Sequence, residues 1–303
     1  MHLVTCIYGY NQQSIYGGRG YELPVYFSAL RNVANLQLPL VLYCDPEKVE
    51  ETENELRPYF GTRLYVIGTP LQDFKYHDTY IEWKKTFVSY TYAENTRNEM
   101  LCLRKYYFLI DTINNPLFAK ESSFMWIDAG LFHDGLFPRR MGGTEYIVRF
   151  PDEHYYPLNP NSMFTPTLGA AIAEQGNKDK LFFCGKDGLD FPSRDNPKYI
   201  SLLQEVTGRE ISYITPHLVG GMFGGNKKNI LDLYNMYDTI VHRSITSKIY
   251  LLEESVFSGL HTACPELFNV NKFEFWGHCC EERHTLAPYD GDSFYKIFKG
   301  LIN

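Results

Sequence analysis

Apolar and polar residues alternate in blocks along the first third of the chain, in the order that strands and helices produce. Short apolar runs at 3–8, 40–44 and 64–67 predict three buried strands. Amphipathic or charged segments at about 23–35 and 47–59 lie between them and predict helices. This β-α-β-α-β order indicates an α/β fold whose parallel sheet has right-handed crossovers and is open to a ligand at its carboxyl edge.

The middle of the chain continues with one long helix and one buried strand. The pattern over 83–113 is helical and stops at Asn114-Asn115-Pro116, and the apolar run 124–128 predicts a further strand. Residues 150–194 are rich in proline, glycine, asparagine and aromatics and show little periodicity. We expect long loops and short strands here that form one wall of a cleft and close over a substrate.

Two further features lie in the last third of the chain. Four glycines within 217–225 precede a helical pattern from about 228 to 242. They indicate either a backbone that approaches a ligand closely or a strand packed tightly on another backbone. Farther on, Glu253 and Glu254 lie in an apolar helical run at 251–257. Neighbouring helical residues point about 100° apart, so we expect one acid, Glu254, to face the crevice.

Composition limits the partners and the compartment. The chain has 303 residues, 44% of them hydrophobic, which is enough for a full core in one large domain. A formal net charge of −7 without a basic stripe argues against nucleic acid as a partner. The amino terminus is too polar for a signal peptide and no apolar run approaches about 20 residues, which predicts a cytoplasmic protein without a transmembrane segment and leaves peripheral membrane contact open. Seven cysteines without a Cys-x-x-Cys spacing predict reduced, mostly buried thiols.

The first candidate for chemistry is the acid that ends the strand at 124–128. Phe-Met-Trp-Ile is followed there by Asp128, Ala129 and Gly130. In an open α/β sheet the carboxyl ends of the strands face the ligand crevice, so Asp128 can meet a metal ion or a polar ligand without being buried unpaired. The same residue could instead cap the following turn, and the sequence leaves both interpretations open.

Taken in order, these segments resemble the HtrL/YibB (WlaTC-like) family, bacterial glycan- and lipopolysaccharide-associated proteins that look like glycosyltransferases of the GT-A fold. The resemblance rests on residues spread over most of the chain: Val4-Thr5, Gly17-Gly18-Arg19, Lys105 ahead of Asn115-Pro116, Trp126 to Gly130, Gly220-Gly221-x-Phe223-Gly224-Gly225, and Glu254. It implies a Rossmann-type mixed sheet flanked by helices in a single catalytic domain over 1–303. The nucleotide-binding half would be 1–130, and the acceptor-binding and catalytic half 131–303.

A more distant likeness is to the ABO blood-group and α-1,3-galactosyltransferase family. Its Asp-x-Asp strand end, glycine block and Asp-Glu-Ser segment have counterparts here in Asp128, the glycines from 220 to 225, and Glu253-Glu254-Ser255. One departure is that glycine stands at 130 in place of the second acid. The resemblances imply a divalent metal, Mn²⁺ or Mg²⁺, on Asp128, with His278 as a second ligand. The residues assigned to binding the cofactor and the donor are Thr5, Tyr8, Arg97, Lys105, Asp128, Gly130, Gly220 and Gly221.

The activity implied is transfer of a sugar from a nucleotide-diphosphate donor, such as a UDP-sugar, to a glycan or glycolipid acceptor. The charge that develops on the diphosphate has to be stabilised, and the metal, Arg97 or Lys105 are the candidates. Glu254 is the candidate catalytic residue, either against the oxocarbenium-like centre or as general base on the acceptor. Two alternatives stay open. One is a non-catalytic carbohydrate-binding protein, suggested by the missing second acid, and the other is a sugar-nucleotide nucleotidyltransferase, suggested by the loop Gly17-Gly18-Arg19.

Overall fold

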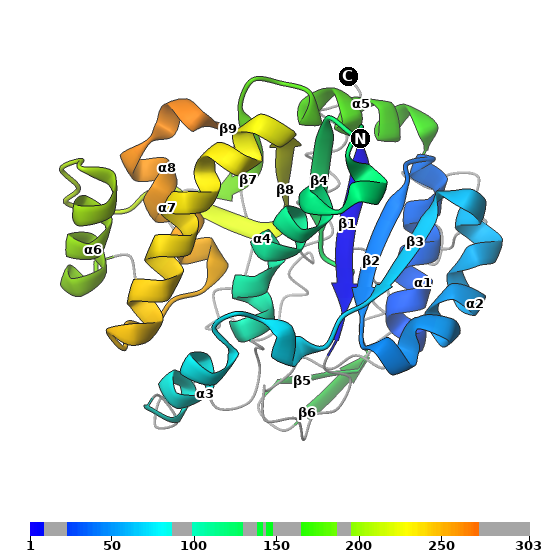
Figure 1. Ribbon diagram of the computed structural model, residues 1–303, viewed down its shortest axis with the longest axis horizontal. Helices are drawn as coiled ribbons and strands as arrows, with labels where there is room; N and C mark the ends of the chain where they lie inside the picture. Colours follow the sequence, from blue (N-terminus) through cyan, green and yellow to red (C-terminus); the bar gives the residue numbers. More distant parts are fainter. Residues whose placement is uncertain are drawn as a thin grey trace.

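The fold is built around one seven-stranded sheet (Figure 1). The computed structural model describes residues 1–8, 23–86, 99–129, 138–141, 144–147, 165–186 and 195–272. The strand order in the sheet is β3-β2-β1-β4-β8-β7-β9. The strand bounds are β1 His2–Ile7, β2 Leu40–Cys44, β3 Leu64–Gly68, β4 Ser123–Ile127, β7 Leu181–Lys186, β8 His217–Asn226 and β9 Phe268–Lys272.

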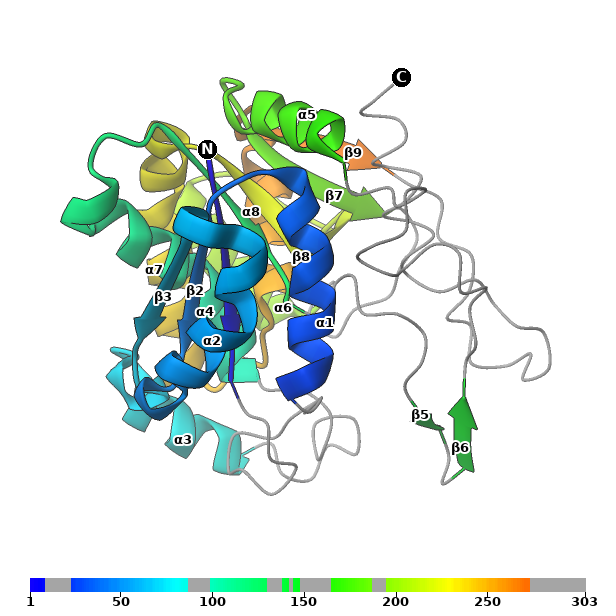
Figure 2. The same ribbon diagram turned by 90° about the vertical axis from the view of Figure 1, so that its right-hand side faces the viewer.

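The sheet is mixed because one of its strands runs against the others. β1, β2, β3 and β4 are parallel to one another, β8 is antiparallel to both β4 and β7, and β9 is parallel to β7. A separate antiparallel pair, β5 (Pro138–Met141) with β6 (Thr144–Ile147), is set apart from the main sheet (Figure 2). The expected α/β fold with a mixed sheet flanked by helices is therefore confirmed.

Helices cover both faces of the sheet. The helices are α1 Leu23–Val33, α2 Val49–Phe60, α3 His77–Thr86, α4 Glu99–Asn114, α5 Pro166–Gly176, α6 Pro197–Thr207, α7 Lys227–Thr246 and α8 Glu253–Ala263. Short 3-10 turns add η1 Ala34–Leu36, η2 Pro46–Lys48, η3 Gly61–Arg63, η4 Leu71–Asp73, η5 Pro116–Phe118 and η6 Pro265–Leu267. One apolar core lies under α1, α2 and α5, and the other under α3, α4, α6, α7 and α8.

Strand β4 contributes side chains to both apolar cores, because successive side chains of a strand point to opposite faces of the sheet. Phe124 and Trp126 pack into the core under α4, and Met125 and Ile127 into the core under α1. An uninterrupted apolar run is what a strand covered on both faces requires. The alternation continues past the strand end, so Asp128 follows Trp126 toward the side of α4.

The neighbours β1 and β4 form the topological switch point of the sheet. From β1 the chain passes through α1 to β2 and then β3, moving outward on one side. It then returns through α4, on the opposite face, to β4 on the other side of β1. In open α/β sheets ligands bind beyond the carboxyl ends of the strands at such a point. Asp128 directly follows β4 at this position.

Two sequence predictions need correction. The helical pattern over 83–113 belongs to two helices, because α3 ends at Thr86 and α4 begins at Glu99; residues 87–98 lie outside the described part. The segment 150–194 is predicted as loops and short strands; the short strand β7 agrees with this prediction, and the helix α5 contradicts it. The small residues of α5 weaken its periodic signal, although Thr165 caps it by accepting a hydrogen bond from the amide of Leu168. The proposed closing over substrate falls mainly on 150–164 and 187–194, outside the described residues.

The glycine block is the strand β8, which packs tightly on the backbone of β4. A Cβ on Gly224 would lie 2.2 Å from the carbonyl oxygen of Phe124 and 2.7 Å from the Cα of Met125. Backbone cannot move aside as a side chain can, so only glycine fits here. The tight-strand interpretation of this segment is confirmed.

Gly224→Ala should therefore lower the free energy of unfolding by about 1–3 kcal/mol, the usual range for overpacking. Gly225→Ala is the matched control, since its Cβ would first meet the flexible Cδ2 of Leu181 at 3.1 Å. Urea unfolding of the two variants beside the parent chain measures the difference. Equal stabilities for the two variants would contradict the proposed packing of β8 on β4.

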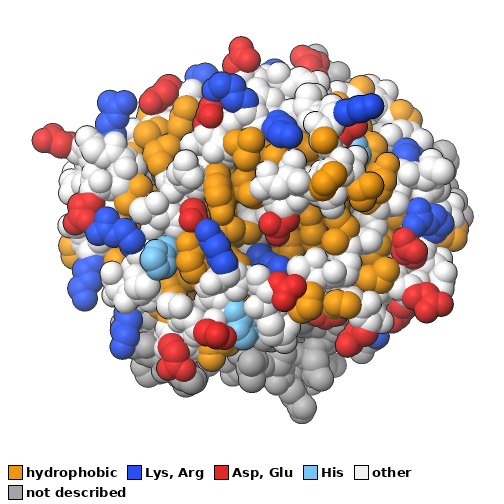
Figure 3. Space-filling model, viewed as in Figure 1, with side chains coloured by type: hydrophobic (Ala, Val, Ile, Leu, Met, Phe, Trp, Pro, Cys, Tyr) orange, Lys and Arg blue, Asp and Glu red, His pale blue; other side chains and the backbone are white. Residues whose placement is uncertain are grey.

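The remaining expectations concern thiols, charge and the membrane. Cys6, Cys44, Cys184 and Cys264 are buried free thiols, and Cys102 is half-buried. Acidic and basic side chains are interspersed on the face shown in Figure 3, without a field of one sign. Among the described residues, no helix is both long enough and apolar enough to span a bilayer.

Candidate functional site

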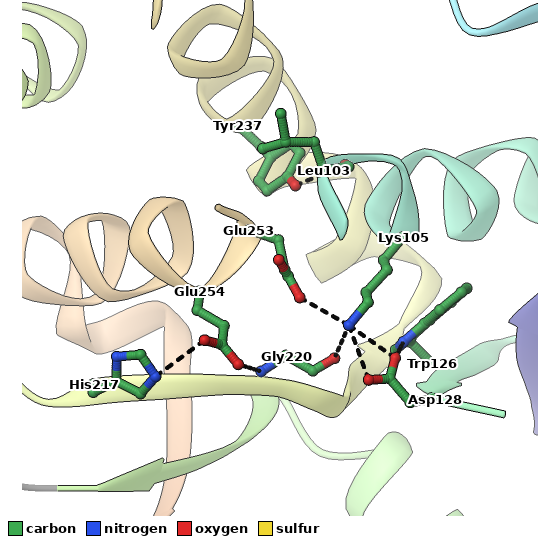
Figure 4. Close-up of polar contacts among 9 residues, drawn as sticks. All are labelled: Leu103, Lys105, Trp126, Asp128, His217, Gly220, Tyr237, Glu253 and Glu254. Atoms are coloured by element: carbon green, nitrogen blue, oxygen red, sulfur yellow. Dashed lines mark hydrogen bonds and ion pairs between the residues drawn. The ribbon is translucent and has the colours of Figure 1, made fainter. Parts of the chain in front are cut away.

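Lys105 of α4 is the centre of a polar cluster at the carboxyl end of β4 (Figure 4). Its Nζ lies 2.9 Å from Oδ1 and 3.0 Å from Oδ2 of Asp128, and 2.8 Å from Oε1 of Glu253. It also donates to the carbonyl oxygen of Gly220 in β8, at 3.2 Å. An ammonium group has three N–H donors, and here they meet three partners on three different elements.

Asp128 is held in one orientation and still reaches solvent. The indole Nε1 of Trp126 donates to its Oδ1 at 2.8 Å, and Lys105 contacts both oxygens. Its backbone amide donates to the carbonyl oxygen of Gly221, which continues the ladder between β4 and β8. The side chain is 35% exposed. The group is thus an oriented carboxylate with acceptor capacity left for a ligand.

Lys105 and Glu253 are both buried, with side-chain exposures of 10% and 3%. Burial by itself lowers the pKa of Lys105, but the charges of Asp128 and Glu253 outweigh it and hold the pKa well above its usual value. Burial raises the pKa of Glu253, against the opposing effect of Lys105, and the neighbouring Glu254 raises it further. Two carboxylates sharing one ammonium leave the cluster short of positive charge.

Glu254 forms the second half of the site, on the other side of Gly220 (Figure 4). Its Oε1 accepts the backbone N–H of Gly220 at 3.2 Å, and its Oε2 lies 3.2 Å from Nε2 of His217. Its side chain is 22% exposed and that of His217 is 9% exposed. Glu254 is therefore a second carboxylate oriented from both oxygens and accessible to a ligand.

Gly220 joins the two halves because both of its backbone groups are used. Its carbonyl oxygen accepts from Lys105 and its amide donates to Glu254. A Cβ on this residue would lie 2.3 Å from Oε1 of Glu253, an atom that Lys105 holds in place. Glycine at this position is what lets the start of α8 approach β8 closely.

The structure brings together five of the sequence-predicted site residues and separates two. Thr5 is buried on the Leu3 and Ile7 side of β1, away from Asp128, and within the described residues its hydroxyl has no hydrogen-bond partner. Tyr8 donates its hydroxyl to the carbonyl oxygen of Thr69, at 2.6 Å. The five that meet are Lys105, Asp128, Gly220, Gly221 and Glu254. Arg97, Gly130 and His278 lie outside the described residues.

Sequence reasoning missed Glu253, His217 and the indole of Trp126. It turned Glu253 away because helical neighbours point about 100° apart. In the structure α8 begins at Glu253, so both acids lie in its first turn, where side chains lean back toward the helix start. Both therefore reach β8, one on each side of Gly220. The adjacent acids were the signal available, but the register of α8 on β8 was needed to use it.

The implied divalent cation does not fit the donors that the described residues offer. Asp128 supplies one carboxylate, and Lys105 contacts both of its oxygens. With a metal–oxygen bond of about 2.1 Å, a cation bound there would lie within about 5 Å of the ammonium. At an effective dielectric constant of about 20 their repulsion is on the order of 7 kcal/mol. Among the described residues, no group of three His, Cys, Asp or Glu side chains is arranged to hold a metal ion.

Glu253→Gln should change how stability depends on pH. Lys105 keeps Asp128 and Gly220, so we expect the substitution to cost only about 1–2 kcal/mol at pH 7. The pKa of Glu253 in the fold lies above its ordinary value of 4.5, so its contribution to stability is fully present below pH 4.5 and is lost as pH rises through the folded value. The parent chain should therefore gain stability over the variant as pH falls from 7 through the folded pKa of Glu253 toward 4.5.

Urea unfolding at pH 5, 6 and 7 measures this gap. Glu205→Gln is the control, because Glu205 is an exposed residue that pairs with Arg243 on the surface. A gap that narrows on acidification would contradict the assigned direction of the Glu253 pKa.

A hollow of about 500 Å³ lies elsewhere on the molecule. It is lined by Ser122, which precedes β4, by Asn226, which ends β8, and by residues of the first turns of α7. These positions are at the opposite end of β4 from Asp128. The hollow is therefore separate from the cluster around Lys105, and no residue predicted from the sequence to act in the site lines it.

Comparisons with known proteins add little to this geometry. The chain matches no protein-family model and no curated protein. Among solved structures it is similar to core-mannan synthase A from Aspergillus fumigatus in its Mn/GDP form, with 10% identity, a TM-score of 0.47, and coverage of 89% of this chain and 72% of that one. It is also similar to a protein described as mannose-1-phosphate geranyltransferase from Thermus thermophilus, with 10% identity, a TM-score of 0.33, and coverage of 90% and 73%. Likenesses this weak assign neither a family nor an activity.

Proposed function

We propose that this protein is a glycosyltransferase that moves a sugar from a nucleotide-diphosphate donor to a glycan or glycolipid acceptor. One observation carries the proposal. Two oriented and partly exposed carboxylates, Asp128 and Glu254, lie on either side of Gly220 at the carboxyl end of β4, beside the switch point of the sheet. Ligands of open α/β sheets bind at this position. Sugar hydroxyl groups donate hydrogen bonds, and such carboxylates accept them.

In the proposed reaction the bond between the sugar C1 and the diphosphate breaks, and a bond from C1 to the acceptor oxygen forms. The diphosphate leaves with the bonding electrons, and the acceptor hydroxyl loses its proton. Asp128 binds hydroxyl groups of the donor with the acceptor capacity that Lys105 and Trp126 leave open. Because its own position is fixed by these two residues, it fixes the sugar relative to the sheet.

Glu254 is the proposed catalytic carboxylate. It either takes the proton of the acceptor hydroxyl or faces the oxocarbenium-like centre at C1. The Gly220 amide and His217 hold both of its oxygens, so the carboxylate meets the reacting atoms in one orientation. The roles of Arg97 and His278 stay predictions. So do the use of UDP as the nucleotide and a cytoplasmic location.

The test is to incubate the protein with a panel of UDP- and GDP-sugars, with and without glycan acceptors, and to measure the nucleotide released. Release of UDP or GDP that depends on Asp128 and Glu254 supports the transferase. Binding of sugars without any release would indicate a carbohydrate-binding protein instead. Pyrophosphate released from a nucleoside triphosphate and a sugar phosphate would indicate a nucleotidyltransferase.

A further inference from the structure

We propose that Lys105 takes the place of a divalent cation at this site, so that Asp128 binds the donor sugar directly and the diphosphate lies away from it. The inference rests on the proposed function and names how that site holds its donor. It concerns the orientation of the substrate as well as the absence of a metal requirement at Asp128.

The position of the ammonium group is the first support. Nζ of Lys105 lies between Asp128 and Glu253, at 2.9 Å and 2.8 Å from their nearest oxygens. A metal ion shared by the two carboxylates would occupy this same space. Lys105 belongs to the helix α4 and its side chain is buried. Its third N–H donates to the carbonyl oxygen of Gly220. The positive charge is therefore part of the fold.

The charge left over is the second support. One ammonium faces Asp128 and Glu253, and Glu254 lies close enough to Glu253 to raise its pKa. The region around Asp128, Glu253 and Glu254 therefore has no excess of positive charge. Without a metal ion it repels a diphosphate. Sugar hydroxyl groups carry no charge and donate hydrogen bonds, which suits the open side of Asp128. The sugar should lie over Asp128 and Glu254, with the phosphates directed elsewhere.

The first arm of the experiment uses Mn²⁺ alone, measured by electron paramagnetic resonance on the full chain. We expect the parent chain and Asp128→Asn to give the same Mn²⁺ isotherm. A Mn²⁺ ion bound by the parent chain and lost in Asp128→Asn would overturn the proposal. This comparison requires no change at Lys105, so it holds even if variants of the lysine fail to fold.

A second arm frees the two carboxylates. Lys105→Met should gain a Mn²⁺ site, with at least tenfold tighter binding than the parent chain, and Lys105→Met combined with Asp128→Asn is the matched control that should lack it. A folded Lys105→Met protein that gains no Mn²⁺ would show that the lysine does not occupy a cation position.

The third arm measures how the donor lies. Affinities for UDP, GDP, UDP-glucose and GDP-mannose are determined by calorimetry in EDTA and in Mn²⁺. We expect Asp128→Asn to lower the affinity for the sugar nucleotide that the parent chain binds by at least tenfold. The affinity for the corresponding nucleoside diphosphate should not change, with or without Mn²⁺. The proposal would be overturned if Mn²⁺ raised the affinity for the nucleoside diphosphate only when Asp128 is present. If no nucleotide binds and none is released, the proposed function fails, while the two Mn²⁺ arms still decide the role of Lys105.

Discussion

Asp128→Asn should reduce turnover of the sugar nucleotide by about 10²- to 10⁴-fold, the range for loss of a positioned group in a catalytic site. Asparagine keeps the size of the side chain but presents one acceptor oxygen instead of two. Lys105 then retains Glu253 and Gly220 as partners, so the fold should persist. Release of nucleoside diphosphate measures turnover, and circular dichroism with urea unfolding measures the fold.

The control for this substitution is Asp45→Asn. Asp45 directly follows β2, at the same carboxyl edge of the sheet, but β1 separates it from β4. Turnover of the control should stay within about twofold of the parent chain, because its contacts do not involve the cluster around Lys105. Full turnover in Asp128→Asn would remove Asp128 from the site. The turn-capping interpretation is tested by Asp128→Ala, which removes the capping oxygen that asparagine keeps, and it would be supported if that variant unfolded.

The sheet could be predicted from the sequence because its strands are short apolar runs with strong boundaries. Strand β2 begins and ends at the predicted residues, and β1, β3 and β4 differ from prediction by a residue or two. Helices cover both faces of the sheet, so most positions in these strands are apolar and the signal is dense. The helix α5 could not be predicted in this way, because its small residues give only a weak helical period.

The sequence predicts some residues of the candidate site but not which of them contact one another. Asp128 stands out in the sequence because an acid at the end of a buried strand needs a polar partner. Lys105 enters only through the family resemblance and as a candidate positive charge for the diphosphate. That they are partners of each other depends on how α4 crosses β4, which no local pattern contains. Glu253 and His217 depend likewise on the packing of α8 on β8. Local sequence therefore indicates which residues have unsatisfied chemistry, and the tertiary fold decides how they are combined.

Glu254→Gln should cut turnover by about 10²- to 10⁴-fold with little change in donor affinity, because a positioned acid or base contributes in the transition state. Glutamine can still accept the N–H of Gly220, so α8 should keep its place on β8. Glu253→Gln is the matched control, one residue away in the same helical turn, and it should lower turnover far less because its carboxylate is buried against Lys105. Single-turnover release of nucleoside diphosphate separates the chemical step from binding. If Glu253→Gln loses turnover and Glu254→Gln keeps it, the catalytic carboxylate lies on the Lys105 side of Gly220. If both variants keep it, neither acid of α8 takes part in the chemistry.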